Sequence, residues 1–385
     1  MKRKYPYSRQ YLDNRDISTV IKTLKSDVIT RGNKVSEFEN KVSKFCKAKY
    51  AVAVNSATSA LHISCLALGV KKGDLVWTVP NTFAATANAA LYCGAKVDFV
   101  DIEWETGNMD LNKLENKLKN SKKKPKIIIP VHFSGQPTDQ ENIFKLSRKY
   151  KFKILEDASH SIGARRNDNK VGNCKWSDIT IFSFHPVKII TTGEGGMALS
   201  NNKKLFEKLK LYRNHGVTRE PILMKKKNNS KWYYEQIELG YNYWISDINA
   251  SLGISQLKKI NKFIKKRNEI AKMYNRNLQN LPIYLPKIKK GNLSTFHLYV
   301  IKLKNNNVKY YNNIFSKLLK KGIDVNLHYL PVHLHPYYKK LGFKSGDYPV
   351  SEKHAKSAIS LPIYFDLNKK QLRHIIKTVK NIIYK

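Results

Sequence analysis

The hydrophobic residues of this chain follow two alternating periods. Short apolar runs rich in Val and Ile, typical of strands buried on both faces, alternate with segments in which apolar residues recur every three or four positions, as in amphipathic helices. The runs that predict strands are 51–54, 75–79, 97–100, 127–131, 153–156, 179–183 and 197–199. The segments that predict helices are 16–24, 36–45, 82–91, 111–118 and 139–150, with a further helix beginning after residue 55. This alternation predicts an α/β fold with a mostly parallel central sheet flanked by helices.

The pattern changes after residue 215. Residues 216–236 have no clear period and include a Lys- and Asn-rich run, so we expect a long, mobile, basic loop there. An amphipathic pattern then predicts one long helix from Asp247 to about Leu278. We therefore expect four parts, which are an N-terminal arm (1–30), a large α/β domain (31–246), a linking helix (247–279) and a small C-terminal α+β domain (280–385).

The formal net charge of +42 narrows the classes of partner. The excess is mostly lysine, with 59 Lys against 12 Arg, and it is spread along the whole chain beside abundant Asn. Proteins that read bases favour Arg and cluster their charge, so this pattern argues against nucleic-acid binding. We interpret the charge as a compositional bias whose general field favours an anionic, phosphorylated substrate.

Other features of the sequence argue against a membrane protein, a secreted protein and a metal-binding protein. No apolar run is long enough to span a bilayer, no apolar segment follows the basic N-terminus, and the four cysteines are widely spaced without a C-x-x-C pair. We therefore expect a cytoplasmic protein that does not associate with membranes. The loop 328–338 holds three histidines, but it contains no Cys or carboxylate and its two prolines restrict the backbone, so we expect no metal site.

Polar and aromatic residues follow four of the predicted strands. The clusters are Asn55-Ser-Ala-Thr58, Pro80-Asn-Thr-Phe83, Glu156-Asp-Ala-Ser-His160 and Ser183-Phe-His-Pro-Val-Lys188. In parallel sheets, ligands bind beside the C-terminal ends of the strands, so we expect these clusters to meet at one edge. The glycines of Thr192-Gly-Glu-Gly-Gly196, which follow the last cluster, would allow the backbone to approach a neighbouring element closely.

Two of the clusters offer the reactive groups that pyridoxal phosphate needs. Lys188 supplies an amine, which can form an imine with an aldehyde when its surroundings keep it neutral. Asp157 supplies a carboxylate for the pyridine nitrogen, and a protonated nitrogen lets the ring accept electrons. A lone lysine in a loop is usually a solvated charge, so the hypothesis for Lys188 depends on the other clusters.

The remaining clusters offer places for the phosphate and the ring face. Ser56, Ala57 and Thr58 lie at a predicted helix N-terminus, which is either an ordinary cap or, with Ser183, a phosphate site. Phe83 offers an aromatic ring that could stack on the cofactor. The chain has no GxGxxG fingerprint, no Walker lysine loop and no metal-ligand spacing that would favour another cofactor.

Seven motifs resemble those of a known family. They are Thr30-Arg-Gly, Asn55-Ser-Ala-Thr-Ser-Ala, Glu156-Asp-Ala-Ser-His, Phe182-Ser-Phe-His-Pro-Val-Lys, Thr192-Gly-Glu-Gly-Gly, Arg213-Asn-His-Gly and Gly240-Tyr-Asn-Tyr. Over nearly its whole length the chain resembles the sugar-nucleotide aminotransferases of the DegT/StrS type, which are pyridoxal-phosphate enzymes of the type I, aspartate-aminotransferase-like fold. The resemblance implies transfer of an amino group from L-glutamate to C4 of a UDP-linked 4-keto-6-deoxy-N-acetyl hexose, as on the pathway to pseudaminic acid.

The resemblance also implies roles around the cofactor. Lys188 would carry the cofactor as an imine and move the proton, Asp157 would pair with the pyridine nitrogen, and His160 would lie near the ring oxygen. The phosphate would be contacted by Ala57, Thr58 and Ser183, and by Asn242 from the partner subunit. The implied active unit is therefore a homodimer with shared active sites.

The same resemblance implies a set of substrate-binding residues. The nucleotide sugar would be held by Tyr7, Asp27, Val28, Ile29, Thr30, Ala57, Ser183, Asn242, His328 and Tyr329. One position departs from the family, because many members have Arg after Gly-Tyr-Asn-Tyr where this chain has Trp244. The contribution of that Arg to substrate or dimer contacts is therefore in doubt here.

Two alternatives stay open from the sequence. Within the family, the substrate could instead be a dTDP- or GDP-linked keto sugar aminated at C3 or C4. Outside enzymes, a basic, non-catalytic binding protein could keep the fold and the glycines. Such a protein need not keep Lys188 and Asp157 together, and some relatives that dehydrate instead have His in place of the lysine, so both residues favour transamination.

Overall fold

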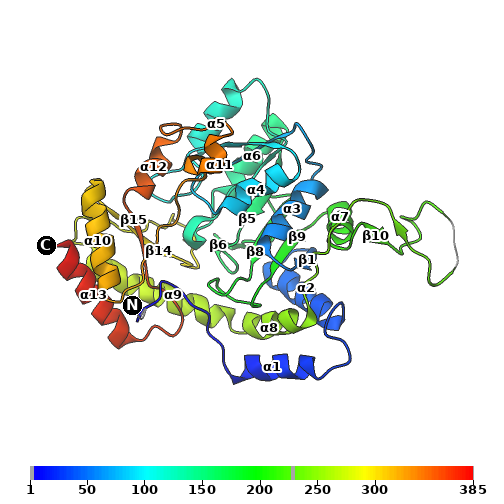
Figure 1. The fold of residues 1–385 in the computed structure, drawn as a ribbon, viewed down its shortest axis with the longest axis horizontal. Helices are drawn as coiled ribbons and strands as arrows, with labels where there is room; N and C mark the ends of the chain where they lie inside the picture. The colour runs from blue at the N-terminus through cyan, green and yellow to red at the C-terminus, as the bar shows by residue number, and fades with distance from the viewer. Residues whose placement is uncertain (1–3, 227–229, 385) are drawn as a thin grey trace.

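A seven-stranded sheet forms the centre of the molecule (Figure 1). The computed structural model describes residues 4–226 and 230–384; residues 1–3, in the predicted arm, and 227–229, in the predicted loop, lie outside the described part, as does residue 385. The strand order is β1 (Tyr50–Val54), β9 (Gly196–Ser200), β8 (Ile179–Ser183), β5 (Lys153–Asp157), β4 (Ile127–Ile128), β2 (Leu75–Thr78) and β3 (Lys96–Phe99). Only β9 runs antiparallel to its neighbours in this sheet, so the predicted α/β fold with a mostly parallel sheet is confirmed.

Helices cover both faces of the sheet because successive side chains of a strand point to opposite faces and both sets here are apolar. Val52, Ile127 and Ile181 pack toward one face, whereas Ala53 and Ile128 pack toward the other. The first face is covered by α3 (Ala57–Ala67), α4 (Ala84–Tyr92) and α7 (Lys203–Arg213). The second is covered by α2 (Asn33–Cys46), α8 (Asp247–Leu257), α5 (Leu111–Asn120) and α6 (Gln140–Tyr150).

Two predictions about the second half of the chain need correction. The predicted single helix 247–278 is broken into α8 and α9 (Ile260–Leu278), and the Lys259 amine at the break pairs with Asp13 (3.0 Å) and Asp16 (2.5 Å) at the start of α1 (Asn14–Leu24). The predicted loop 216–236 contains two short antiparallel strands, β10 (Val217–Thr218) and β11 (Glu235–Gln236). This hairpin extends away from the rest of the molecule (Figure 1).

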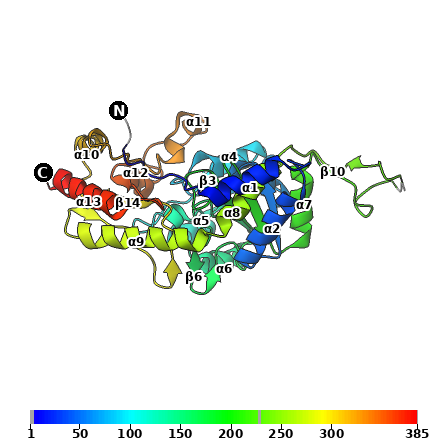
Figure 2. The same ribbon diagram turned by 90° about the horizontal axis from the view of Figure 1, so that it is seen from below.

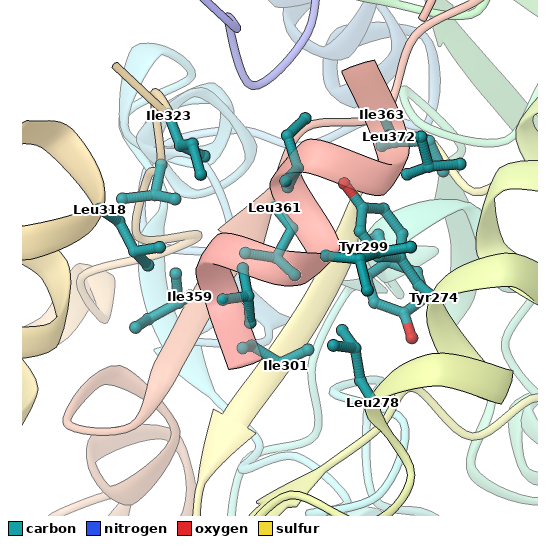
Figure 3. Packing of buried hydrophobic residues seen from close by; sticks show 14 of the residues in the cluster. Tyr274, Leu278, Tyr299, Ile301, Leu318, Ile323, Ile359, Leu361, Ile363 and Leu372 are labelled. Atoms are coloured by element: carbon teal, nitrogen blue, oxygen red, sulfur yellow. The ribbon is translucent and has the colours of Figure 1, made fainter. Parts of the chain in front are cut away.

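The C-terminal part of the chain packs around its own small sheet. Strands β12 (Ile283–Tyr284), β14 (Tyr299–Leu303) and β15 (Ala358–Leu361) pair antiparallel, and α9, α10 (Val308–Lys320) and α13 (Lys369–Ile383) enclose them with a core that includes Tyr274, Tyr299 and Leu318 (Figure 3). Figure 2 shows α9 running from the large sheet region to this layer. The predicted domain boundaries stay a prediction, supported by this separate core.

Shorter elements complete the fold. They are β6 (Arg165–Arg166), β7 (Asn169–Lys170), β13 (Asn292–Leu293), α11 (Pro336–Lys339), α12 (Pro349–Ala355) and the 3₁₀ turns Phe133–Gly135 and Val332–Leu334. The N-terminal arm begins against the C-terminal layer, where Tyr5 is buried, and then passes to α1, which packs on α8. Within residues 4–226 and 230–384, no helix is both long and apolar enough to cross a lipid bilayer.

Candidate active site

The four polar clusters that follow β1, β2, β5 and β8 line one cavity of about 480 Å³ at the C-terminal edge of these strands. Residues of the second half of the chain and of the arm line the rest of its wall. The cluster residues in its wall are Ser56, Ala57, Thr58, Thr82, Phe83, Asp157, Ser159, His160, Ser183 and Lys188, and the remainder include Tyr7, His297, His328 and Tyr329. The geometry thus brings together groups that are far apart in sequence, as expected for a sheet of this type.

The side-chain amine of Lys188 has a lowered pKa. Its side chain is half-buried in the cavity wall, and burial lowers its pKa to about 8, although the negative charge of Asp157 acts in the opposite direction. A lysine in this state is a nucleophile for carbonyl carbon near neutral pH, because a useful fraction of it is uncharged.

Asp157 is held in one orientation at the end of β5. The residue is 4% exposed, and its carboxylate accepts hydrogen bonds from the Thr86 hydroxyl (2.8 Å), the Ser159 backbone N–H (3.1 Å) and the Ser159 hydroxyl (2.6 Å). The sequence reading missed Thr86 and Ser159. Thr86 was detectable in principle, since it follows Thr82 by four residues in the predicted helix 82–91 and therefore lies on the same helix face.

The N-terminus of α3 provides donors for an anion. Ser56 is the N-cap, and its side-chain oxygen accepts the Ser59 N–H (3.1 Å), so the earlier N–H groups of the first turn, those of Ala57 and Thr58, have no acceptor within the helix. Gly196 of β9 lies so close that a Cβ there would be 2.5 Å from the Ala57 nitrogen. The close approach expected of the glycine cluster is therefore present, and it brings β9 against the start of α3.

Three buried histidines surround the lysine. Burial, followed by the charge of Lys188, holds the pKa of His160 well below its usual range, and burial with the same lysine lowers the pKa of His328 to about 3. His297 lies with its ring centre 4.3 Å from that of His160, and burial lowers its pKa in the same way. His160 Nε2 bonds the Tyr329 hydroxyl (3.1 Å), and burial raises the pKa of that hydroxyl. These rings are therefore neutral, and they add hydrogen-bonding groups without adding charge.

His297 is the main cavity residue that the sequence reading did not single out. It stands just before β14, and its Nδ1 is buried without a hydrogen-bond partner in the described part of the chain. In the sequence it is the first residue of the apolar run 297–303. Only the packing of the C-terminal part of the chain against the large sheet region brings it to the cavity, so no local signal could have identified it.

Several predicted site residues do not line this cavity. The segment Asp27–Thr30 is exposed on the turn after α1, and Asn242 is exposed beside Asn214. Phe83 does line the cavity, with 65% of the residue exposed and its ring centre 6.4 Å from that of Tyr329. Its role as a stacking ring therefore stays a prediction, as do the roles of Asn242 and of Asp27–Thr30.

Trp244 holds two guanidinium groups. The Arg213 guanidinium lies 3.8 Å from the indole ring centre and that of Arg31 lies 5.5 Å from it, while the indole N–H donates to the Asn214 side chain (3.0 Å). Arg213 is itself buried and paired with Glu39 (2.5 Å). The tryptophan therefore orders neighbouring cations by stacking.

Two of the three histidines of the loop 328–338 bond other side chains. His328 Nδ1 bonds the Ser360 hydroxyl (2.7 Å), and His333 Nε2 bonds Glu352 (3.0 Å). Within the described ranges, no group of three or more His, Cys, Asp or Glu residues is arranged to hold a metal ion.

Known proteins resemble this chain over almost its whole length. The DegT/DnrJ/EryC1/StrS aminotransferase family model matches residues 10–380. The UDP-4-amino-4,6-dideoxy-N-acetyl-beta-L-altrosamine transaminase of Campylobacter jejuni subsp. jejuni serotype O:2 is 40% identical over 382 residues, which cover 98% of this chain and 97% of the relative. GDP-perosamine synthase of Vibrio cholerae is 30% identical over 354 residues, 92% of each chain.

Solved structures agree with this assignment. Helicobacter pylori PseC, an aminotransferase involved in the biosynthesis of pseudoaminic acid, superposes with a TM-score of 0.90 at 31% identity, covering 99% of both chains. A putative sugar aminotransferase of Streptococcus pneumoniae, solved in PLP and PMP forms, gives TM-scores of 0.90 and 0.91 at 29% identity, with coverage of 98% of this chain and 97–98% of the other. Aminotransferases of this family depend on pyridoxal phosphate. The chain described here is an enzyme of the DegT/DnrJ/EryC1/StrS aminotransferase family.

Proposed function

We propose that this enzyme uses pyridoxal phosphate to move an amino group from L-glutamate to C4 of a UDP-linked 4-keto-6-deoxy-N-acetyl hexose, a reaction of the pseudaminic acid pathway type. The observation that carries the proposal is the pairing, in one cavity, of a lysine whose pKa is lowered to about 8 with a buried, oriented carboxylate. The 40% identity to a transaminase that acts on a UDP-linked amino sugar supports this substrate class.

The cavity residues fit pyridoxal phosphate by their chemistry. A free amine is available at Lys188, an ionisable carboxylate at Asp157, and unpaired helix N–H groups at Ala57 and Thr58. His160 Nδ1 is a buried polar atom without a partner in the described part of the chain, as expected if a ligand atom supplies the missing hydrogen bond. In this order, the four features would bind the aldehyde, the ring nitrogen, the phosphate and the ring oxygen of the cofactor.

The residues would divide the work as follows. The bound cofactor supplies an aldehyde that takes up an amino group and a ring that accepts electrons. Lys188 would hold the carbonyl carbon when neutral and take or give a proton at Nζ when released. Asp157 would keep a proton on the ring nitrogen, and Ser183 with the start of α3 would bind the phosphate. His160 and Tyr329, which bond each other, would orient the groups around the lysine without adding charge.

A homodimer would complete the site. Asn242 and Asp27–Thr30 are exposed and outside the cavity of their own subunit, which supports a role in the cavity of a second copy. The cavity of about 480 Å³ is small for a cofactor together with a nucleotide sugar, so further walls from a partner would enlarge the binding surface. All four cysteines are free thiols, in keeping with the proposal that the enzyme acts in the reducing cytoplasm.

A substrate screen tests the proposal. The enzyme is loaded with pyridoxal phosphate, converted to the amine form with L-glutamate, and offered UDP-, dTDP- and GDP-linked 3- and 4-keto sugars in turn. We expect the UDP-linked 4-keto N-acetyl sugar to restore the aldehyde absorbance fastest. The 30% identity to a GDP-perosamine synthase makes a GDP-linked 4-keto sugar the second candidate, and a faster response to it would replace the proposed substrate.

A further inference from the structure

A closed ring of hydrogen bonds lies behind Asp157, on the opposite face of β5. The Arg166 side chain (Nε) donates to the Thr138 carbonyl (3.2 Å), and the Thr138 N–H donates to His132 Nδ1 (3.0 Å). His132 Nε2 bonds Glu156 Oε1 (2.7 Å), and Arg166 pairs with the same oxygen and closes the ring. None of the four residues is more than 6% exposed.

The proton positions in this ring follow from its donors. A backbone N–H only donates, so His132 Nδ1 accepts and its single proton is on Nε2, which donates to Glu156. Burial, followed by the charge of Arg166, holds the pKa of His132 well below its usual range, so the ring stays neutral at that residue. The carboxylate and the guanidinium are then the only charges, and they neutralise each other.

His132 connects the ring to Asp157. Its backbone N–H donates to the Asp157 carbonyl (3.1 Å), while its imidazole holds the side chain of Glu156, the residue before. The Asp157 N–H bonds the Pro130 carbonyl (2.9 Å) in the same segment after β4. The end of β5 is therefore attached to the β4 segment through the backbone of residue 157 and through the side chain of residue 156.

Stability alone is a poor explanation for this arrangement. A buried ion pair usually contributes little net stability compared with apolar residues of the same volume, because both charges lose their hydration. A closed ring of directional bonds does fix geometry, since moving one member breaks two bonds. The carboxylate of Asp157 needs fixed geometry more than any other group in the cavity, because its partner would be a single ring nitrogen.

We propose that the ring formed by His132, Thr138, Glu156 and Arg166 positions the backbone of Asp157. Together with Thr86 and Ser159, which orient the carboxylate, it thereby sets the direction in which that carboxylate meets the cofactor's ring nitrogen. This inference rests on the proposed use of pyridoxal phosphate. The four residues do not line the cavity, so they act only through the end of β5.

The test compares three substitutions at the Glu156 carboxylate and two of its partners. Glu156→Gln keeps the shape but removes the charge that Arg166 and His132 share. Thr180→Val is the matched control, because the Thr180 hydroxyl also donates to Glu156 (2.6 Å) but lies outside the ring. Arg166→Lys is a second variant that keeps the charge but is expected to open the ring, since one ammonium cannot reproduce the guanidinium's two-sided contact.

Each variant is titrated with pyridoxal phosphate, and its thermal unfolding is measured without cofactor. We expect Glu156→Gln and Arg166→Lys to weaken cofactor binding about tenfold or more, and to alter the pH dependence of the bound cofactor's absorbance, which reports the ring nitrogen. Thr180→Val should lose stability but bind the cofactor as the wild type does.

Three outcomes would overturn the inference. The first is wild-type affinity in Glu156→Gln. The second is a loss of affinity in all three variants that follows their loss of stability, which indicates a structural role alone. The third outcome matters if Glu156→Gln does not fold. In that case, wild-type cofactor affinity and absorbance in Arg166→Lys would overturn the inference. A wild-type protein that binds no pyridoxal phosphate would instead refute the proposed function itself.

Discussion

Replacing Asp157 with Asn should lower the pKa of Lys188 below its value of about 8. Burial is the main cause of the low pKa of Lys188, and the Asp157 carboxylate opposes it by stabilising the ammonium. Removing that negative charge leaves burial unopposed, so the neutral amine becomes more favoured. The substitution should therefore lower the pKa of Lys188, although Asn has nearly the same shape as Asp and residue 157 lies at the end of a different strand.

The size of the effect in the wild type follows from the same value. At pH 7, a lysine of pKa about 8 is uncharged in about one molecule in ten, whereas an ordinary lysine is uncharged in about one in 2,500. Lys188 should thus react with a reagent for neutral amines about 200 times faster than an ordinary lysine of equal accessibility. In Asp157→Asn the advantage should increase further.

Trace acetylation of the cofactor-free protein over a range of pH, with peptide mass spectrometry, measures this directly. The midpoint for Lys188 should lie near pH 8 in the wild type and lower in Asp157→Asn. Asp178→Asn is the control, because Asp178 pairs with Lys153 (3.2 Å), which lies at the other end of β5 from Asp157. This substitution should leave the Lys188 midpoint unchanged. A wild-type midpoint near 10, or a rise in Asp157→Asn, would refute this account of the electrostatics.

Two further substitutions probe the cavity wall and the strand that packs against the start of α3. Thr86→Val removes the hydroxyl that donates to Asp157 and should weaken the binding of pyridoxal phosphate by about 1.5–3 kcal/mol. The control is Thr78→Val, because Thr78 is also buried but bonds only a backbone carbonyl, so its loss should lower stability alone. Equal affinities of the two variants in an equilibrium titration would contradict this. Gly196→Ala should lower the free energy of unfolding by about 1–3 kcal/mol, because the added methyl group would meet the start of α3. The same clash should weaken phosphate binding at that helix start. An unchanged denaturant midpoint would show that the close approach is not required.

The strand ends were predictable because their signals are local. Each of the four clusters follows a short apolar run, and a parallel sheet brings such ends to one edge regardless of their distance in sequence. Lys188, Asp157 and Ser56 could therefore be placed together before the fold was known. The helices were predicted for the same reason, because each carries its own apolar period.

Contacts between distant parts of the chain were not predictable. His297 and the hydrogen-bonded ring that includes His132 and Arg166 depend on how loops and the C-terminal layer pack, and no periodic pattern reports that. The break between α8 and α9 was missed because the apolar period continues through it. At the break Lys259 pairs with the carboxylates of α1 and its cap, a tertiary contact that the local sequence does not report.

The central claim is that Lys188 is the one amine among many that captures pyridoxal phosphate. The most direct measurement is to mix the protein with one equivalent of pyridoxal phosphate, reduce with borohydride, and map the modified peptide by mass spectrometry. The account predicts that the modification is found on Lys188 and is lost in Lys188→Ala. Modification spread over surface lysines, or unchanged by that substitution, would contradict it.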